Sequence, residues 1–126
     1  MYYYVALGKI YKDKNNISSS NRNFRKALSI TKDKFHLTEI YKSLGELYLI
    51  QKQFSLSKKH LFKALEFSNS SFGEYALETT EILNKIGLYY EAQNKLDKAL
   101  LYYQKAVIQN QRDYFEVDLY LSLIHI

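Results

Sequence analysis

The sequence predicts an all-α protein, a truncated α-solenoid of three antiparallel helix pairs. Three observations predict this fold class. Apolar residues recur at the spacing of amphipathic helices, one set of residues repeats three times along the chain, and none of the 126 residues is a proline, which would interrupt long helices.

No stretch reaches the roughly 20 apolar residues that cross a bilayer, and the N-terminus lacks the features of a signal peptide. We therefore expect a soluble, cytoplasmic segment with no membrane contact.

Each copy of the repeat consists of two helical segments. The copies are "YVALGKIY" (4–11) with "ISSSNRNFRKAL" (17–28), "YKSLGELY" (41–48) with "FSLSKKHLFKAL" (54–65), and "LNKIGLYY" (83–90) with "LDKALLYYQKAV" (96–107). The first segment always contains an aliphatic residue, a glycine and a tyrosine, and the second always contains an apolar opening residue, a small residue, a large residue and an alanine. In chain order these positions are Leu7, Gly8, Tyr11, Ile17, Ser20, Phe24 and Ala27; Leu44, Gly45, Tyr48, Phe54, Ser57, Leu61 and Ala64; and Ile86, Gly87, Tyr90, Leu96, Ala99, Tyr103 and Ala106.

The length of the pattern is constant within a copy and varies between copies. Its first and last positions are 24 residues apart in all three copies, whereas successive glycines are separated by 37 and then by 42 residues. A packed helix pair tolerates no insertion, but a surface connection does. We infer rigid hairpins joined by variable connections, of which the longest is "FSNSSFGEYALETTEI" (67–82), centred on Phe72 and Gly73.

The third copy illustrates the predicted packing faces. Its first segment has apolar residues at i, i+3, i+4 and i+7, which is one face of a helix; these are Leu83, Ile86, Gly87 and Tyr90. The second segment repeats the spacing and predicts one face formed by Leu96, Ala99, Leu100 and Tyr103, continued by Ala106 and Val107. Between them, "AQNKLD" (92–97) is the expected turn, and Asp97 is expected to cap or charge the start of the next helix.

The recurring glycines require an explanation, because a glycine inside a helix costs about 1 kcal/mol relative to alanine. We interpret them as points of close approach, at which the large residue of the second helix fills the space left by the missing side chain. The alanines are expected to do the same from the other side. Most of the 13 tyrosines are then packing residues whose phenol oxygens reach the rim of the core.

The pattern resembles the tetratricopeptide repeat, whose first helix carries an aromatic residue, Leu-Gly and Tyr, and whose second helix carries a small residue, an aromatic residue and Ala. The match covers about residues 1–110. The 42-residue spacing is similar to the variety found in kinesin light chains and many bacterial proteins. Departures from the pattern are Leu83 and Leu61 in place of aromatic residues, and Ser20 and Ser57 in place of Ala.

A further departure concerns the end of each repeat. Many tetratricopeptide repeats end with a proline, and this chain has Lys32, Asn69 and Gln111 at the three corresponding positions. The departure predicts second helices that continue past the usual stop.

The resemblance implies a right-handed superhelix whose first helices line a concave groove, and a protein or peptide as the partner. By analogy with the family, the groove residues are Val5, Lys9, Lys12, Glu39, Lys42, Glu46, Leu49, Glu81, Asn84, Leu88 and Glu91. This set is mixed in charge. Its lysines and asparagine do not form the particular set with which some relatives hold a C-terminal carboxylate, so we do not expect that ligand in the groove.

The pattern also predicts how the chain is divided. We expect repeat units at 1–34, 35–72 and 73–113, and the start of a further element at 114–120. The last six residues, "LSLIHI" (121–126), have no counterpart in the repeat, and the same six residues are encoded by a DNA string that resembles a transposon end used in sequencing libraries. We therefore expect a non-native tail on a fragment of a longer protein. The alternative is the native start of a fourth first helix.

No pattern in the chain indicates catalysis, and we predict no catalytic residue, no metal and no cofactor. Cysteine is absent, which excludes thiolate chemistry, and neither a phosphate-binding glycine loop nor a Ser-His-Asp order occurs. We interpret His36, His60 and His125 as ordinary residues, with His36 at a connection and His60 in a basic surface cluster. The carboxylates of Glu74, Glu78 and Glu81 are interpreted as charges that favour the start of a helix.

Two alternative functions remain. The stretch "LYYQKAVIQNQRDYFEVDLY" (101–120) resembles the end of repeat arrays that precede caspase-like CHAT peptidase domains in bacteria, which implies the regulatory arm of an enzyme. Arrays that precede sensor kinases or transcription regulators are competing parents. Nucleic-acid binding through Lys58, Lys59 and Lys63 is the second alternative. It is the weaker one, because the net charge of +5 arises from 18 basic residues interspersed with 13 acidic ones.

Overall fold

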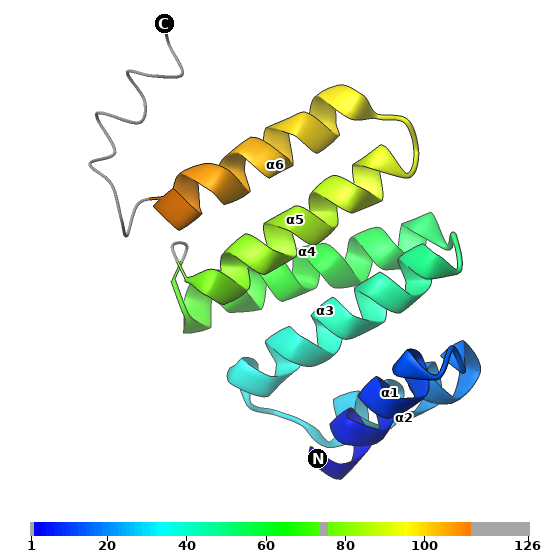
Figure 1. Cartoon of the computed structure of the whole chain (residues 1–126). Coiled ribbons are helices and arrows are strands. Elements are labelled where there is room, and N and C mark those ends of the chain that lie inside the picture. Colours follow the sequence, from blue (N-terminus) through cyan, green and yellow to red (C-terminus); the bar gives the residue numbers. More distant parts are fainter. Residues whose placement is uncertain (1, 74–75, 112–126) are drawn as a thin grey trace, which may run out of the picture. The chain divides into compact units, whose positions relative to one another are not determined.

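The computed structural model describes residues 2–73 and 76–111, which form six α-helices (Figure 1). These are α1 (Tyr2–Asp13), α2 (Ile17–Ile30), α3 (Lys34–Ile50), α4 (Phe54–Ser71), α5 (Leu77–Glu91) and α6 (Leu96–Gln111). No strand occurs in these residues, and the predicted all-α fold of three helix pairs is confirmed. The chain divides into two compact units, 1–67 and 68–126, with the boundary inside α4. The predicted segments 114–120 and 121–126 lie outside the described residues.

Within each pair the two helices approach closely at the glycine, as predicted. A side-chain carbon added at Gly8 would lie 2.8 Å from the Phe24 ring, and one added at Gly45 would lie 2.7 Å from the Leu61 side chain. At Gly87 the added carbon would lie 2.5 Å from the ring of Tyr103. All three distances are far shorter than an ordinary carbon–carbon contact of 3.5–4.0 Å. The large residue of the second helix therefore occupies the space that any other residue would need.

A hydrogen bond accompanies this contact in the first two pairs. The Ser20 hydroxyl donates to the Gly8 carbonyl oxygen at 2.6 Å, and the Ser57 hydroxyl donates to the Gly45 carbonyl oxygen at 2.8 Å. Both serines are completely buried, so the bond satisfies a hydroxyl that would otherwise destabilise the core. The sequence pattern indicated only a small residue at this position, and in the third pair Ala99 provides no hydroxyl.

The turn that joins the two helices of a pair has the same geometry three times. Asn15, Lys52 and Asn94 adopt left-handed φ angles of 62°, 59° and 59°. The amide of the following residue donates to the carbonyl oxygen of the recurring tyrosine, over 2.8 Å for Tyr11, 2.8 Å for Tyr48 and 3.0 Å for Tyr90. This is the Schellman arrangement, which ends a helix by bonding its last carbonyl groups. Tyr11, Tyr48 and Tyr90 thus close the turns through their backbones.

Unit 1–67 has a continuous apolar core between its helices. Its buried members are Val5, Phe24, Ala27, Ile40, Leu44, Leu47 and Tyr48, with Tyr4, Ile17 and Leu28 packed against them. In unit 68–126 the buried apolar residues of α5 are Ile82, Leu83, Ile86, Tyr89 and Tyr90, and those of α6 are Ala99 and Ala106. The predicted packing face of residues 83–90 is confirmed, because Leu83, Ile86, Gly87 and Tyr90 are all buried.

The predicted packing face of α6 is partly wrong. Ala99 and Ala106 are buried as expected, but Leu96, Leu100 and Val107 are 62%, 56% and 44% exposed. The contact line of α6 is formed by Ala99, by Tyr103 over Gly87 and by Ala106, and the three exposed residues lie to the side of it. The equivalent residues Ile17 and Leu28 of the first pair pack against the core of unit 1–67, so this exposure is particular to the third pair. Asp97 lies in the first turn of α6 and so charges the helix start.

The second helix continues past the position of the usual proline in the second repeat, where α4 runs through Asn69 to Ser71. In the third repeat α6 reaches that position at Gln111, and the residues after it lie outside the described part of the chain. The prediction is wrong for the first repeat, because α2 ends at Ile30, before Lys32. There Thr31 is extended (φ −98°, ψ 132°) and its hydroxyl donates to the Ala27 carbonyl oxygen at 2.6 Å. A side chain that bonds to the last turn in this way favours termination over another helical turn.

The connection between α4 and α5 is shorter than the sequence suggested. Most of residues 67–82 are helical, since α4 ends at Ser71 and α5 begins at Leu77. Gly73 has a φ of +89°, which favours glycine. The Thr79 hydroxyl donates to the Gly73 carbonyl oxygen at 2.8 Å and accepts from the Ser68 hydroxyl at 2.7 Å. These bonds fasten the connection to the helices on both sides, within unit 68–126.

The glycine contact leads to a stability prediction for Gly45. Replacing it with leucine forces the new side chain against Leu61, including its backbone nitrogen, which would lie 3.1 Å from the added carbon and cannot rotate away. We expect Gly45→Leu to lower the free energy of unfolding by roughly 1–3 kcal/mol more than Lys42→Leu on the same helix. Urea denaturation followed by circular dichroism measures both variants. Equal midpoints would contradict the close-approach explanation.

The turn geometry leads to a second stability prediction. Lys52 has a left-handed backbone conformation, which costs a residue with an ordinary side chain about 1–2 kcal/mol. The equivalent residues of the other two turns, Asn15 and Asn94, are asparagines, which tolerate this conformation better. We expect Lys52→Asn to raise the free energy of unfolding by about 0.5–1 kcal/mol. The control is Lys58→Asn inside α4, where asparagine is the poorer helix former and should destabilise slightly. A lower melting temperature for Lys52→Asn than for the parent would refute the argument.

Candidate functional site

The groove residues predicted on the first helices of unit 1–67 lie next to one another. Lys9 and Lys12 on α1 form ion pairs with Glu39 and Glu46 on α3, and the Lys12–Glu46 distance is 2.5 Å. The side chains of Lys12 and Glu46 are 30% and 26% exposed, and those of Lys9 and Glu39 are 54% and 39% exposed. The structure therefore joins four of the predicted residues into two cross-helix pairs whose charged ends still face solvent.

The other predicted residues of this unit differ in accessibility. Lys42 and Leu49 are half-buried on α3. Val5 is only 8% exposed and belongs to the apolar core with Phe24 and Ile40, so it offers almost no surface to a partner. Its position three residues before Gly8 places it on the packing face of α1, a signal that the sequence contained.

In unit 68–126 the predicted residues form one exposed stripe along α5. Glu81, Asn84, Leu88 and Glu91 follow a helical spacing, and all four are exposed. Leu88 is an apolar residue with 49% of its surface exposed, and it lies between Asn84 and Glu91 on the stripe. The Tyr103 hydroxyl donates to a Glu91 carboxylate oxygen at 3.1 Å. Burial, and then this hydrogen bond to a carboxylate, raise the pKa of the Tyr103 phenol, so the phenol stays protonated as a donor.

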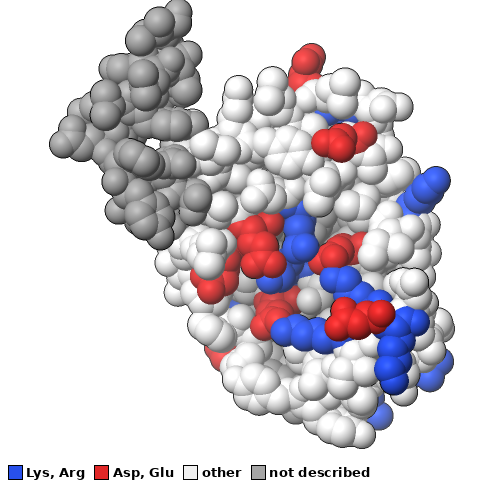
Figure 2. Space-filling view, in the orientation of Figure 1, with Lys and Arg blue, Asp and Glu red and all other residues white. Residues whose placement is uncertain are grey.

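Acidic and basic side chains are interspersed over the visible surface of the molecule (Figure 2). Of the lysines considered for nucleic-acid binding, Lys58, Lys59 and Lys63 are exposed, and the Lys63 ammonium lies 5.3 Å from the centre of the Phe67 ring. The ring contact holds Lys63 against its own helix, at the spacing of one helical turn. These three lysines therefore form a short solvated row on α4.

His60 is not a surface residue, contrary to the sequence interpretation. It is 9% exposed, its ring lies 5.0 Å from that of Tyr48 and 5.7 Å from that of Tyr41, and its Nδ1 is 2.8 Å from the Leu56 carbonyl oxygen. Burial lowers the pKa of His60, and the positive charges of Lys59 and Arg25 lower it further, against the opposing effect of the Leu56 bond. His60 follows the buried Ser57 by three residues and precedes the buried Ala64 by four, a periodicity that the neighbouring lysines obscured.

A short chain of hydrogen bonds links α1 to the start of α3. The Tyr2 hydroxyl lies 2.5 Å from Nε2 of His36, whose Nδ1 lies 2.7 Å from an Asp33 carboxylate oxygen. Asp33 also accepts from the Phe35 amide and caps α3. The order Asp–His–hydroxyl is that of a proton relay, but Tyr2 is 68% exposed and the Asp33 side chain 58%, so bulk water surrounds both ends. The arrangement fastens the two helices together.

The remaining residues singled out in the sequence give no reactive centre. Glu78 lies in the first turn of α5, where a carboxylate favours the helix dipole. Glu74 and His125 lie outside the described residues. Within residues 2–73 and 76–111, no three acidic or histidine side chains are grouped so that they can hold a metal ion. None of the helices that the structure describes is both long enough and apolar enough to cross a bilayer.

Comparison with known proteins identifies the repeat. One sequence model of the tetratricopeptide repeat matches residues 37–107, and a second matches residues 2–34. The crystal structure of BtubC (BKLC) from P. vanneervenii superposes with a TM-score of 0.72 at 22% sequence identity, which shows a shared fold. The superposition covers 86% of this chain and 45% of BtubC, so the chain spans less than half the length of that protein. No curated protein sequence matches the chain.

The buried histidine leads to a prediction about pH. Because the pKa of folded His60 is lower than the ordinary value of 6.5, the unfolded chain takes up the proton first as the pH falls. The free energy of unfolding should therefore decrease as the pH is lowered from 6.5 towards the lower pKa of the folded state. We expect His60→Gln to remove this part of the pH dependence, measured as the change in urea midpoint between about pH 7.5 and pH 5.5. The same pH dependence in variant and parent would show that His60 does not cause it.

Proposed function

The chain belongs to the tetratricopeptide repeat family, whose repeats generally mediate protein–protein interactions, and we propose that it is a scaffold that binds a protein or peptide segment along its first helices. The proposed binding surfaces are the charged residues of α1 and α3 in unit 1–67 and the stripe on α5 in unit 68–126. They are built from the sequence-predicted groove residues, except Val5, which is buried.

The observation that best supports this proposal is the pairing of charges between α1 and α3. An ion pair at a surface contributes only about 0–1 kcal/mol to stability, so the Lys9–Glu39 and Lys12–Glu46 pairs are not needed to hold the core together. They do hold four charged side chains in fixed positions on adjacent helices. A partner meets charges that are already arranged, and less side-chain freedom is lost on binding.

The stripe on α5 suggests the chemistry of the partner. Glu81 and Glu91 provide negative charge at its two ends, Asn84 provides a polar amide, and Leu88 provides an exposed apolar contact. A complementary segment has an apolar residue with one basic residue on each side of it. Buried apolar contact near the centre of an interface usually contributes most of the affinity, while the charges at its edge set specificity.

The function of a longer protein that contains this chain is a separate matter. The resemblance of residues 101–120 to arrays that precede CHAT peptidase domains stays a prediction, as do the repeat boundaries at 34, 72 and 113. Whether or not a peptidase domain follows it in a longer protein, we propose that the repeat segment itself acts by binding, because tetratricopeptide repeats are typically non-enzymatic scaffolds.

Selection of peptides from a displayed random library, with this chain as the immobilised target, tests the proposal. We expect enriched peptides to carry basic residues around an apolar one, and their affinity to fall about tenfold or more in the double variant Glu81→Gln, Glu91→Gln. The matched control is Glu66→Gln with Asp97→Asn, which removes the same charge from the exposed surfaces of α4 and α6. Equal losses of affinity in the two double variants would show that the stripe is not the binding surface.

A further inference from the structure

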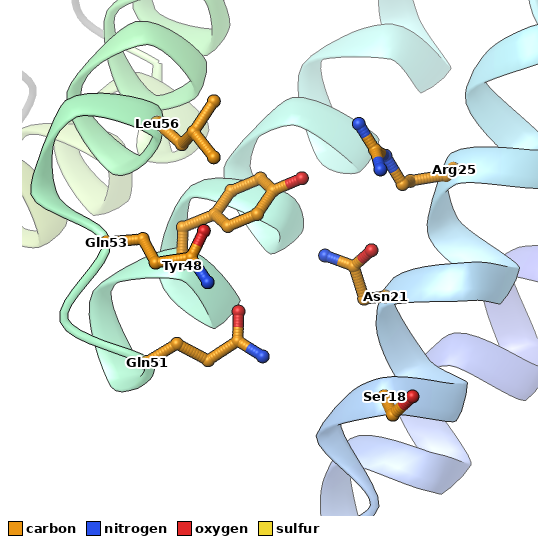
Figure 3. Close-up of a pocket in the computed structure, with 7 residues that line it drawn as sticks. All are labelled: Ser18, Asn21, Arg25, Tyr48, Gln51, Gln53 and Leu56. Atoms are coloured by element: carbon orange, nitrogen blue, oxygen red, sulfur yellow. The ribbon is translucent and has the colours of Figure 1, made fainter.

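A polar hollow lies at the turn between α3 and α4, within unit 1–67 and apart from the groove residues (Figure 3). It has a volume of about 300 Å³, which is the lower limit for ligand pockets and suits a small organic ion or one terminal residue of a peptide. It is lined by Ser18, Asn21 and Arg25 of α2, by Tyr48 of α3, by Gln51 and Gln53 of the turn, and by Leu56 of α4.

Tyr48 forms the inner wall of the hollow. It is 4% exposed, and its ring packs against that of His60. Its hydroxyl points into the open space, towards Arg25 and Asn21 (Figure 3). Among the described residues this hydroxyl has no hydrogen-bond partner, although a buried tyrosine usually has one. The ring is therefore fixed by burial, and its hydroxyl remains as a donor that faces the hollow.

The charge of the lining favours an anion. Arg25 is its one charged residue, and none of the seven lining residues is acidic. Figure 3 shows the side chains of Arg25, Asn21 and Gln51 extending into the same space from opposite sides. Ser18 and Leu56 belong to the first turns of α2 and α4, so the positive ends of two helix dipoles also lie at this place.

The donors distinguish one kind of anion from another. A planar guanidinium matches a carboxylate with two parallel hydrogen bonds. The other donors are neutral: one phenol, one hydroxyl and three carboxamides. A single positive charge with neutral donors balances one negative charge, whereas a phosphate group carries up to two near neutral pH.

We propose that this hollow binds a carboxylate group, presented either by a small free acid or by the C-terminus of a peptide. Arg25 pairs with the carboxylate, the Tyr48 hydroxyl donates to it from the inner wall, and the amides of Asn21 and Gln51 bond to its outer oxygen. The site uses no groove residue, so it is independent of the function proposed above, and either can fail without the other.

Nuclear magnetic resonance of the ¹⁵N-labelled chain tests the site with N-acetylglycine as the probe. We expect saturable shifts of the side-chain amides of Asn21, Gln51 and Gln53, with a millimolar dissociation constant, and no shift with uncharged N-acetylglycinamide. An acetylated tetrapeptide with a free C-terminus that binds about tenfold more tightly than N-acetylglycine would identify a peptide as the source, and equal affinity would identify a small acid. Tighter binding of inorganic phosphate than of either carboxylate would overturn the assignment.

Matched variants separate this site from general charge attraction. We expect Arg25→Gln to weaken N-acetylglycine binding about tenfold or more, and Tyr48→Phe, which keeps the ring that packs on His60, to weaken it about threefold to tenfold. Arg22→Gln is the control, since Arg22 is exposed on the same helix and does not line the hollow. An equal effect of Arg22→Gln and Arg25→Gln, or the absence of saturable shifts up to about 50 mM probe, would refute the proposal.

Discussion

The closeness of the two helix backbones within each pair is the constraint on which the rest of the structure depends. With a large side chain seated on a glycine of the first helix, only small residues fit at the nearest positions of the second helix, such as Ala99 and Ala106, which are both buried. The same closeness requires an abrupt reversal of the chain. A left-handed residue followed by an amide that bonds back to a tyrosine carbonyl provides it in every pair.

This constraint also determines which side chains remain for binding. Contacts inside a pair bury the glycine face of each first helix, and Val5 is buried together with it. Lys9 and Lys12 lie beyond that face, where their partners are Glu39 and Glu46 of the neighbouring first helix. The surface proposed for recognition is thus a by-product of repeat packing. It can change in charge without disturbing the core, because its residues do not fill the space between the helices.

Much of the fold was predictable because the repeat displays each packing position three times, so the glycines, the large residues opposite them and the helix pairs stand out from the background. Features that occur once were harder to predict. Thr31 ends α2 through one hydroxyl bond, and His60 is buried among lysines that suggest a solvated face. The lining of the polar hollow comes from two stretches, 18–25 and 48–56, that lie far apart in the sequence, so only the folded chain brings Arg25 and Gln51 together. The groove residues on α1 and α3 came from family resemblance, and the structure adds their pairing.

The buried serine hydroxyls also determine the register in which the two helices of a pair align. A helix that slid along its partner would lose the fit of its large residue over the glycine, and in addition Ser20 and Ser57 would leave the Gly8 and Gly45 carbonyl oxygens and remain buried without an acceptor. Each bond therefore penalises the wrong alignment by about the 1–3 kcal/mol that an unsatisfied buried polar group costs. In the third pair Ala99 carries no such penalty, and alignment depends on the fit of Tyr103 over Gly87. The first two pairs are thus fixed in register by a hydrogen bond as well as by shape, and the third by shape alone.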